Sequence, residues 1–181
     1  DIRMNTNSSL SAKEVVNEYT QEDLANVLYE HGELRNSRAI EREIVEASEQ
    51  EAIITTNQLI DIVARMVPEK KRNQFLARIF QAIRIEVNDE MKSLEEMLLD
   101  AVDMLNKGGR LVVLSYHSLE DRMVKNLMKN GKLEGELEKD FFGNPIKDLT
   151  EITRKVIVAS KQQIEENTRA RSAKLRIAEK K

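Results

Sequence analysis

The 181-residue chain has no cysteine, no tryptophan, and only two prolines and two histidines. The absence of cysteine excludes disulfides, thiolate catalysis and cysteine-ligated zinc. The two histidines, His31 and His117, are too far apart in the sequence to favour a histidine-based metal site, so we expect no metal. Because cysteine-free chains suit a reducing compartment, we expect a cytoplasmic protein.

Long hydrophobic runs are also absent. No stretch approaches the roughly 18–20 apolar residues that cross a bilayer, and the first residues lack the order of a signal peptide. With 40% apolar residues the chain can still bury a sizeable core. We therefore expect one soluble domain, or a domain with a helical insertion, and no membrane partner. The opening letters DIRMN carry no initiator methionine, which suggests a fragment.

Common nucleotide-binding and hydrolase motifs are missing as well. The sequence has no GxGxxG, no GxxxxGK[ST] and no GxSxG. These absences argue against a dinucleotide-binding glycine loop, a P-loop and a nucleophile elbow. Any chemistry must therefore come from other residues.

Charge is unevenly distributed along the chain. The net charge is −3, yet residues 167–181, NTRARSAKLRIAEKK, set six basic residues against the single acid Glu179. A second basic cluster is KKR at 70–72. Such asymmetry can mark nucleic-acid contacts, although solvated surface lysines explain each cluster equally well.

The first part of the chain has a helical period. From about residue 11 to 106, apolar residues recur at helical spacing. The letters SAKE at 11–14 have the form of a capping box. Further helices are predicted after Thr20, near 35–48, and from about Thr56 to Pro68; a pattern over 73–105 predicts two helices that meet near Asn88. We expect a helical subdomain here.

The period changes after Gly108 and Gly109. The letters RLVVLSY at 110–116 form a short, almost wholly apolar run, which predicts a buried strand. A helix over about 118–129, a strand-like segment at 151–159, a short helix at 161–166 and a final strand at 171–179 should follow. This order is typical of the end of an open α/β sheet.

The candidate active residues follow the predicted buried strand. In open α/β sheets ligands bind beyond the carboxyl ends of the strands, and His117 and Ser118 fall at such an end. An imidazole titrates near neutrality and can donate or accept a proton. The structural alternative is that Ser118 caps the next helix while Glu120 and Asp121 favour its positive end. The residues alone leave both interpretations open.

Two further polar sets have two interpretations each. Arg84 and Asn88 lie four residues apart on one helix face beside a core stripe, so they serve either a buried network or a ligand. The basic tail is either an edge strand defended by charge or a strip that contacts phosphates.

Five stretches, in order, carry a resemblance to a known family. They are DIRMN, HGELRNSRAI, FQAIRIEVNDEM, GGRLVVLSYHSLEDRMVK and NTRARSAKLRIAE. Together they closely resemble the MraW/RsmH family of S-adenosylmethionine-dependent methyltransferases, over Asp1 to about Glu179. That family modifies the exocyclic amine of a cytidine in the decoding region of bacterial small-subunit ribosomal RNA.

The resemblance implies an α/β fold, namely part of a Rossmann-like (class I) methyltransferase sheet with an inserted all-α subdomain. It implies three parts: residues 1–8 as a remnant of the methyltransferase core, 9–88 as the inserted subdomain and 89–181 as the C-terminal part of the core. In relatives a substantial segment carrying the main cofactor residues precedes the motif matched by DIRMN, so the resemblance implies an incomplete cofactor site. Asn5, where many relatives have Asp, and the loop at 130–148 depart from the family pattern.

The resemblance also implies roles for matched positions. His117, Ser118, Glu120 and Asp121 would line the substrate side of the cleft as catalytic candidates. Arg84 and Asn88 would face the same cleft, while Arg169, Arg171 and Lys174 would meet RNA phosphates. Asp1 and Arg3 would lie near the cofactor, S-adenosylmethionine. The implied partner is small-subunit ribosomal RNA, and a homodimer is compatible with it; the alternative is a non-catalytic helical module that binds RNA or the ribosome.

Overall fold

A computed structural model describes residues 2–153 and 155–181. The chain divides into two compact units, Asp1–Glu90 and Met91–Lys181, which are described separately below. In the part of the chain that the structure describes, no helix combines the length and hydrophobicity needed to cross a membrane. Asp1, which the family resemblance places near the cofactor, lies outside the described residues.

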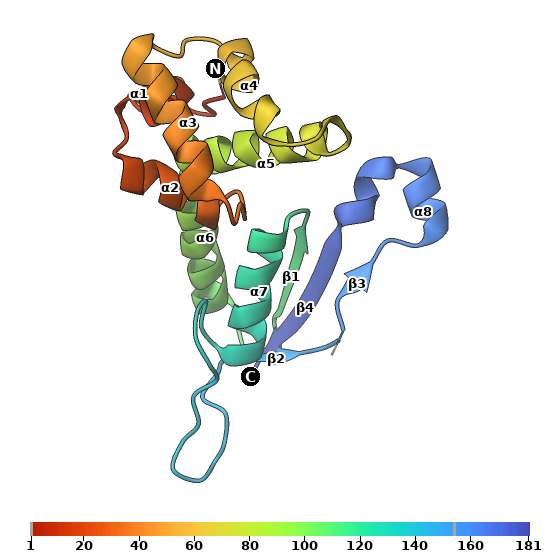
Figure 1. The fold of residues 1–181 in the computed structure, drawn as a ribbon. Coiled ribbons are helices and arrows are strands. Elements are labelled where there is room, and N and C mark those ends of the chain that lie inside the picture. Colours follow the sequence, from red (N-terminus) through yellow and green to blue (C-terminus); the bar gives the residue numbers. More distant parts are fainter. Residues whose placement is uncertain (1, 154) are drawn as a thin grey trace. The chain divides into compact units, whose positions relative to one another are not determined.

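The first unit is helical (Figure 1). Its elements are α1 (Ala12–Glu18), α2 (Gln21–Glu30), α3 (Ser37–Gln50), α4 (Thr56–Val63), the 3₁₀ turn η1 (Ala64–Met66) and α5 (Glu69–Asn88). Apolar side chains from all five α-helices form one core, with Leu28, Ile40, Ile44, Val63 and Ile79 fully buried. The helical period read from the sequence is confirmed.

Local capping residues set the helix starts in this unit. The predicted capping box at Ser11 is present, since Ser11 accepts from the first turn and Glu14 bonds back to the Ser11 N–H at 2.8 Å. Thr20 caps α2 and Thr55 caps α4, because each side chain accepts a hydrogen bond from a free N–H group in the first turn of its helix. Pro68 separates η1 from α5, as its missing N–H and fixed φ require.

The predicted junction near Asn88 is confirmed. Helix α5 ends at Asn88, α6 (Glu90–Met104) begins two residues later, and Asp89 between them has a φ of 49°, in the left-handed region. The Asp89 N–H bonds back to the last turn of α5, which is how a left-handed residue ends a helix. Before α1, Ile2 packs against the helical core.

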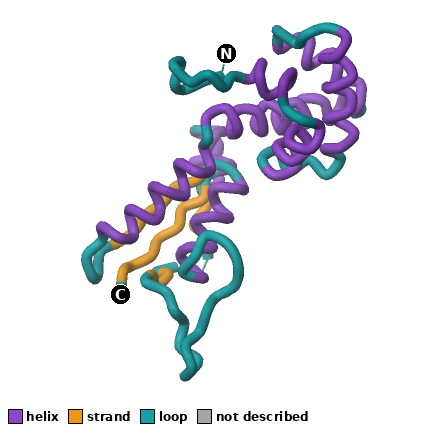
Figure 2. The backbone as a smooth tube through the Cα atoms, turned by 90° about the vertical axis from the view of Figure 1, so that its left-hand side faces the viewer, coloured by secondary structure: helices purple, strands orange, loops and turns teal. Residues whose placement is uncertain are grey.

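The second unit is a small sheet with helices. Its remaining elements are β1 (Arg110–Ser115), α7 (Ser118–Asn130), β2 (Leu149–Glu151), β3 (Ile157–Val158), α8 (Lys161–Glu166), the 3₁₀ turn η2 (Thr168–Ser172) and β4 (Lys174–Lys180). Among the described residues, β4 pairs antiparallel with β1 on one side and with β2 and β3 on the other. Figure 2 shows the strands beside the helices and the long loop at 131–148.

Two strands of this unit, β1 and β2, are parallel and are connected by a helix, as in α/β proteins. Because β1 and β2 both run antiparallel to β4, they run parallel to each other, and α7 connects them. The core between helices and sheet contains Leu98 and Val102 from α6, Leu111 from β1, Val124, Leu127 and Met128 from α7, Leu149 from β2 and Ala178 from β4. The mixed α/β class is confirmed, although every strand pair in the described residues is antiparallel.

Three strand predictions need correction. The run at 110–116 is buried on one face only, since Leu111 and Ser115 are buried while Val112 and Leu114 are 56% and 52% exposed. Successive side chains in a strand point to opposite faces, and the helices cover one of them. The described residues of the segment at 151–159 form only the last residue of β2, Glu151, and the two-residue strand β3. The final strand starts at Lys174, because 168–172 form a 3₁₀ turn.

The tail is also not an edge strand. Strand β4 has hydrogen-bonded neighbours on both sides and is the central strand of the sheet. The charged residues of β4 therefore do not protect an unpaired sheet edge from aggregation. Their role depends on the groups that they contact.

Candidate active site

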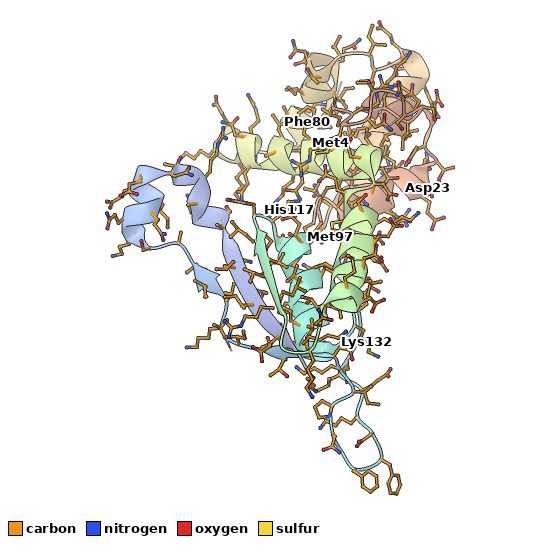
Figure 3. All side chains as sticks on the ribbon, turned by 180° about the vertical axis from the view of Figure 1, so that it is seen from behind. Met4, Asp23, Phe80, Met97, His117 and Lys132 are labelled. Carbon is orange, nitrogen blue, oxygen red and sulfur yellow. The ribbon has the colours of Figure 1, made fainter. Side chains whose placement is uncertain are left out.

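His117 lies at the turn from β1 to α7 (Figure 3). Strand β1 ends at Ser115 and α7 begins at Ser118, so His117 is the N-cap residue, with extended backbone angles. Its side chain makes no capping hydrogen bond. Within the described residues both ring nitrogens are shielded from solvent and have no hydrogen-bond partner. An unsatisfied buried polar group costs roughly 1–3 kcal/mol, so an imidazole left in this state invites a functional explanation.

Ser118 and Glu120 follow His117 closely in the sequence. Ser118 is the first residue of the helix and not its cap, so that part of the structural alternative is wrong, whereas Glu120 and Asp121 do lie in the first turn of α7. The Glu120 carboxylate accepts a hydrogen bond from the Tyr116 N–H at 3.0 Å. Its negative charge also lies in the first turn of α7, at the positive end of the helix dipole. Glu120 therefore fixes the backbone on the N-terminal side of His117.

The Asp121 carboxylate is buried and forms ion pairs with two cations. Its Oδ1 accepts from Arg176 Nε at 2.7 Å, its Oδ2 accepts from Arg176 Nη2 at 3.2 Å, and Lys174 Nζ lies 3.3 Å from Oδ2. Arg176 and Lys174 are on β4, so this cluster joins α7 to the central strand. Burial alone would raise the pKa of Asp121, but the hydrogen bonds and charges of Arg176 and Lys174 outweigh it and lower the pKa. Asp121 is thus ionised and held in place.

Arg84 and Asn88 take part in a network inside the first unit. Arg84 forms two hydrogen bonds to Glu90, at 2.8 and 3.0 Å. The Asn88 amide donates to the carbonyls of Ile2 and Arg84 and accepts from the Met4 N–H at 2.6 Å. The structure shows both side chains in a hydrogen-bonded network, and their assignment to a ligand stays a prediction. These side chains secure the segment before α1 to the end of α5.

The remaining predicted residues lie in different settings. Arg169 and Arg171 are exposed on η2, whereas Lys174 is half-buried on β4 beside Asp121. Arg3 donates to the Ser8 carbonyl at 2.7 Å. The structure therefore brings Asp121 and Lys174 together and places Arg169 and Arg171 on a separate turn of the same unit.

Sequence reasoning missed Arg176, which pairs with Asp121, and Glu90, which pairs with Arg84. It also missed a hydrogen-bonded cluster in the first unit: Tyr19 donates to Glu86 at 2.7 Å, and His31 lies 3.3 Å from the same carboxylate. The His31 hydrogen bond, assisted by that of Tyr19, lowers the pKa of Glu86 against the effect of burial. Burial, followed by the hydrogen bond to Glu86, raises the pKa of Tyr19. The alternation of charge in β4 was a signal for Arg176; the Tyr19 cluster joins residues 67 positions apart and had none.

Comparison with curated proteins gives close relatives over the whole chain. A protein of Bacteroides thetaiotaomicron named ribosomal RNA small subunit methyltransferase H is 50% identical over 181 residues, covering 100% of this chain and 60% of the relative. Proteins with the same name from Flavobacterium psychrophilum and Amoebophilus asiaticus are 52% and 43% identical, and the chain covers 62% and 58% of them. The chain thus spans about 60% of the length of these relatives. The sequence profile of the MraW methylase family matches residues 1–181, and the chain belongs to that family.

Proposed function

We propose that this chain is part of an S-adenosylmethionine-dependent methyltransferase that acts on small-subunit ribosomal RNA. The observation that carries the proposal is the family match over residues 1–181, together with relatives named for that reaction. The proposed target is the exocyclic amine of a cytidine in the decoding region. In this assignment the sheet of the second unit is the C-terminal part of a Rossmann-like methyltransferase core, residues 1–8 are a remnant of that core, and 9–88 are an insertion.

The residues that the structure describes do not by themselves make a site for the cofactor. Asp1 lies outside the described residues, and the Arg3 guanidinium already donates to the Ser8 carbonyl. The sequence also has no glycine-rich loop of the kind that holds nucleotides. We therefore expect calorimetry of this chain with S-adenosylmethionine to show little heat.

His117 is the residue that we assign to the substrate. A cytosine edge offers a donor at its exocyclic amine and acceptors at N3 and O2, and an imidazole can donate from one nitrogen and accept at the other. Both His117 nitrogens lack a partner in the described residues and are shielded from solvent in this state, so the turn must open before they can bond to a base turned out of its stack. Methyl transfer to a nearly neutral amine depends mainly on alignment, for which positioning can contribute about 7–11 kcal/mol.

Asp121 takes a different role in this proposal. Its oxygens are occupied by Arg176 and Lys174, so it is a positioning residue that fixes α7 to β4 and thereby the turn at His117. Ser118 and Glu120 belong to the same turn. Arg169 and Arg171, which are exposed and close in sequence, remain our candidates for phosphate contacts.

The test uses the gene product that contains this chain, with small ribosomal subunits and radiolabelled S-adenosylmethionine. His117→Ala should lower kcat/KM about a hundredfold or more, in the range typical of lost substrate alignment. Asp121→Asn should lower kcat/KM less and reduce thermal stability at the same time. Full activity of both variants would remove the assignment of this turn. Salt-dependent RNA binding without any methyl transfer by the wild type would favour the non-catalytic module instead.

A further inference from the structure

A pocket on the helical unit has a positively charged rim. Its volume is about 400 Å³, within the range of small-ligand sites, and all of its lining residues lie between Glu33 and Arg78. Among the described residues, that lining holds three cations, Arg35, Lys71 and Arg78, and one carboxylate, Glu33. The rim therefore has a net positive charge, although the whole chain has a net charge of −3.

The cations come from two elements that a glycine allows to approach. Lys71, Gln74 and Arg78 are three and four residues apart on α5, so they share one helix face. Arg35 lies in the turn before α3. A Cβ at Gly32 would lie 2.6 Å from the Leu28 carbonyl oxygen of α2 and 3.1 Å from the Arg78 carbonyl oxygen of α5, so glycine lets this turn pass close to both helices. The close approach places Arg35 beside the basic face.

These three cations are free to bind an external anion. Arg35, Lys71 and Arg78 are exposed, and no ion pair of theirs occurs within the described residues, unlike Arg65, which pairs with Glu43. Helix α3 begins beside them, and its N-cap residue Asn36 makes no side-chain bond to the first turn. The positive end of a 14-residue helix adds to the same field.

The floor of the pocket differs from its rim. Leu34 and Phe75, both largely buried, line it together with Val67. An apolar floor beneath a cationic rim suits a nucleotide, whose ribose can lie on carbon while its phosphate meets guanidinium and ammonium groups. The amides of Gln74 and Asn36 add hydrogen-bonding groups at the edge.

We propose that Arg35, Lys71 and Arg78 form a phosphate-binding pocket that holds the RNA backbone on the helical unit. This inference rests on the proposed function for the identity of the polyanion, since an acidic peptide would meet the same charges. It gives Lys71 of the basic cluster at 70–72 and the neighbouring Arg35 a shared role, and it adds phosphate contacts to those proposed for Arg169 and Arg171.

The test measures binding of this 181-residue chain to a short fluorescein-labelled single-stranded RNA by anisotropy, between about 50 and 200 mM KCl. The pocket variant is Arg35→Gln/Lys71→Gln/Arg78→Gln. The control variant Lys13→Gln/Arg42→Gln/Arg65→Gln removes the same charge from exposed residues of the same unit outside the pocket. Thermal unfolding followed by circular dichroism checks that both variants fold, and single Lys71→Gln provides a milder change.

We expect the pocket variant to bind RNA at least tenfold more weakly at the lower salt concentration. Its slope of log affinity against log salt should fall by about two, since each phosphate contact on a single strand contributes roughly 0.7. The control variant should change both quantities much less. Equal losses in both triple variants would show that overall charge is responsible, and would overturn the proposal.

Two further outcomes separate this proposal from its alternatives. If poly-L-glutamate bound the wild type as tightly as RNA and lost as much affinity in the pocket variant, the pocket would be an acidic-peptide site and the RNA proposal would fall. Absence of methyl transfer by the gene product would overturn the proposed function while leaving a pocket-dependent RNA affinity intact. Unchanged RNA affinity in the pocket variant, with methyl transfer intact, would overturn the pocket alone.

Discussion

The Arg176 guanidinium holds the Asp121 carboxylate by two hydrogen bonds, at 2.7 and 3.2 Å, and so joins strand β4 to helix α7. The two side chains are only 14% and 10% exposed. Arg176→Gln should leave a buried carboxylate with Lys174 as its remaining cation, and should cost about 3–5 kcal/mol of unfolding free energy. Urea unfolding of the wild type and the variant measures this loss of free energy. Arg171→Gln, on the exposed turn η2, should stay within about 0.5 kcal/mol; equal effects of the two substitutions would contradict this account.

The same cluster should make stability depend on acid. The pKa of Asp121 is lowered in the folded chain, because Arg176 and Lys174 outweigh the effect of burial. The stabilisation from its ionised form is therefore complete above the unfolded pKa, near 3.9, and is lost as pH falls through the lower folded value. Asp121→Asn lacks this titration. We expect the stability gap between wild type and Asp121→Asn to be constant from pH 7 to about 5 and to narrow below about 4. Urea unfolding at pH 7, 5, 4 and 3 measures the gap, and a gap that stays constant to pH 3 would argue against the pairing.

The two faces of β1 should respond differently to the same substitution. Leu111 is 9% exposed and packs with the core of the second unit, whereas Leu114 on the other face is 52% exposed. Leu111→Ala should cost about 2–4 kcal/mol through lost burial and a cavity, and Leu114→Ala less than about 1 kcal/mol. Both changes reduce strand propensity equally, so the difference isolates packing. Urea unfolding of both variants measures it, and similar costs would mean that both faces of the strand are buried in solution.

Two glycines of the second unit have a matched backbone and different surroundings. Gly131 and Gly108 have φ values of 78° and 80°, but a Cβ at Gly131 would lie 2.6 Å from Lys147 Cβ, while Gly108 has open space. Gly108→Ala should cost about 1 kcal/mol from the left-handed backbone alone. Gly131→Ala should cost clearly more, because the loop at 131–148 must shift away from the C-terminus of α7. Melting temperatures that rank the two variants in the reverse order would refute the close approach.

Local signals predicted most of the helices and little of the sheet pairing. The capping box at Ser11, the stop at Pro68 and the junction near Asn88 depend on neighbours within a few residues, so the sequence reveals them. The central position of β4 depends on pairing with β1, about sixty residues earlier, and its turn at 168–172 was read as strand. A single strand pattern does not say which neighbours flank it.

The same limit applies to the candidate site. The placement of His117 at a strand end could be read from the period change alone, and the structure confirms that position. The partners of Asp121 and Arg84 could not be read in this way, because Arg176 is distant in sequence and Glu90 belongs to the next helix. Polar residues beside a core pattern predict that a partner exists and leave its identity open.

The pairing of Ser115 with Lys174 has a consequence for biosynthesis. As the nascent chain leaves the ribosome, β1 emerges long before β4, and its registered neighbour in the described residues arrives only with the segment after η2. The helical unit has no such delay, since its contacts lie within the first ninety residues. Closure of so long a loop is slow relative to helix formation, so the sheet should form last. Until then the apolar face of β1 is exposed to solvent or bound by chaperones.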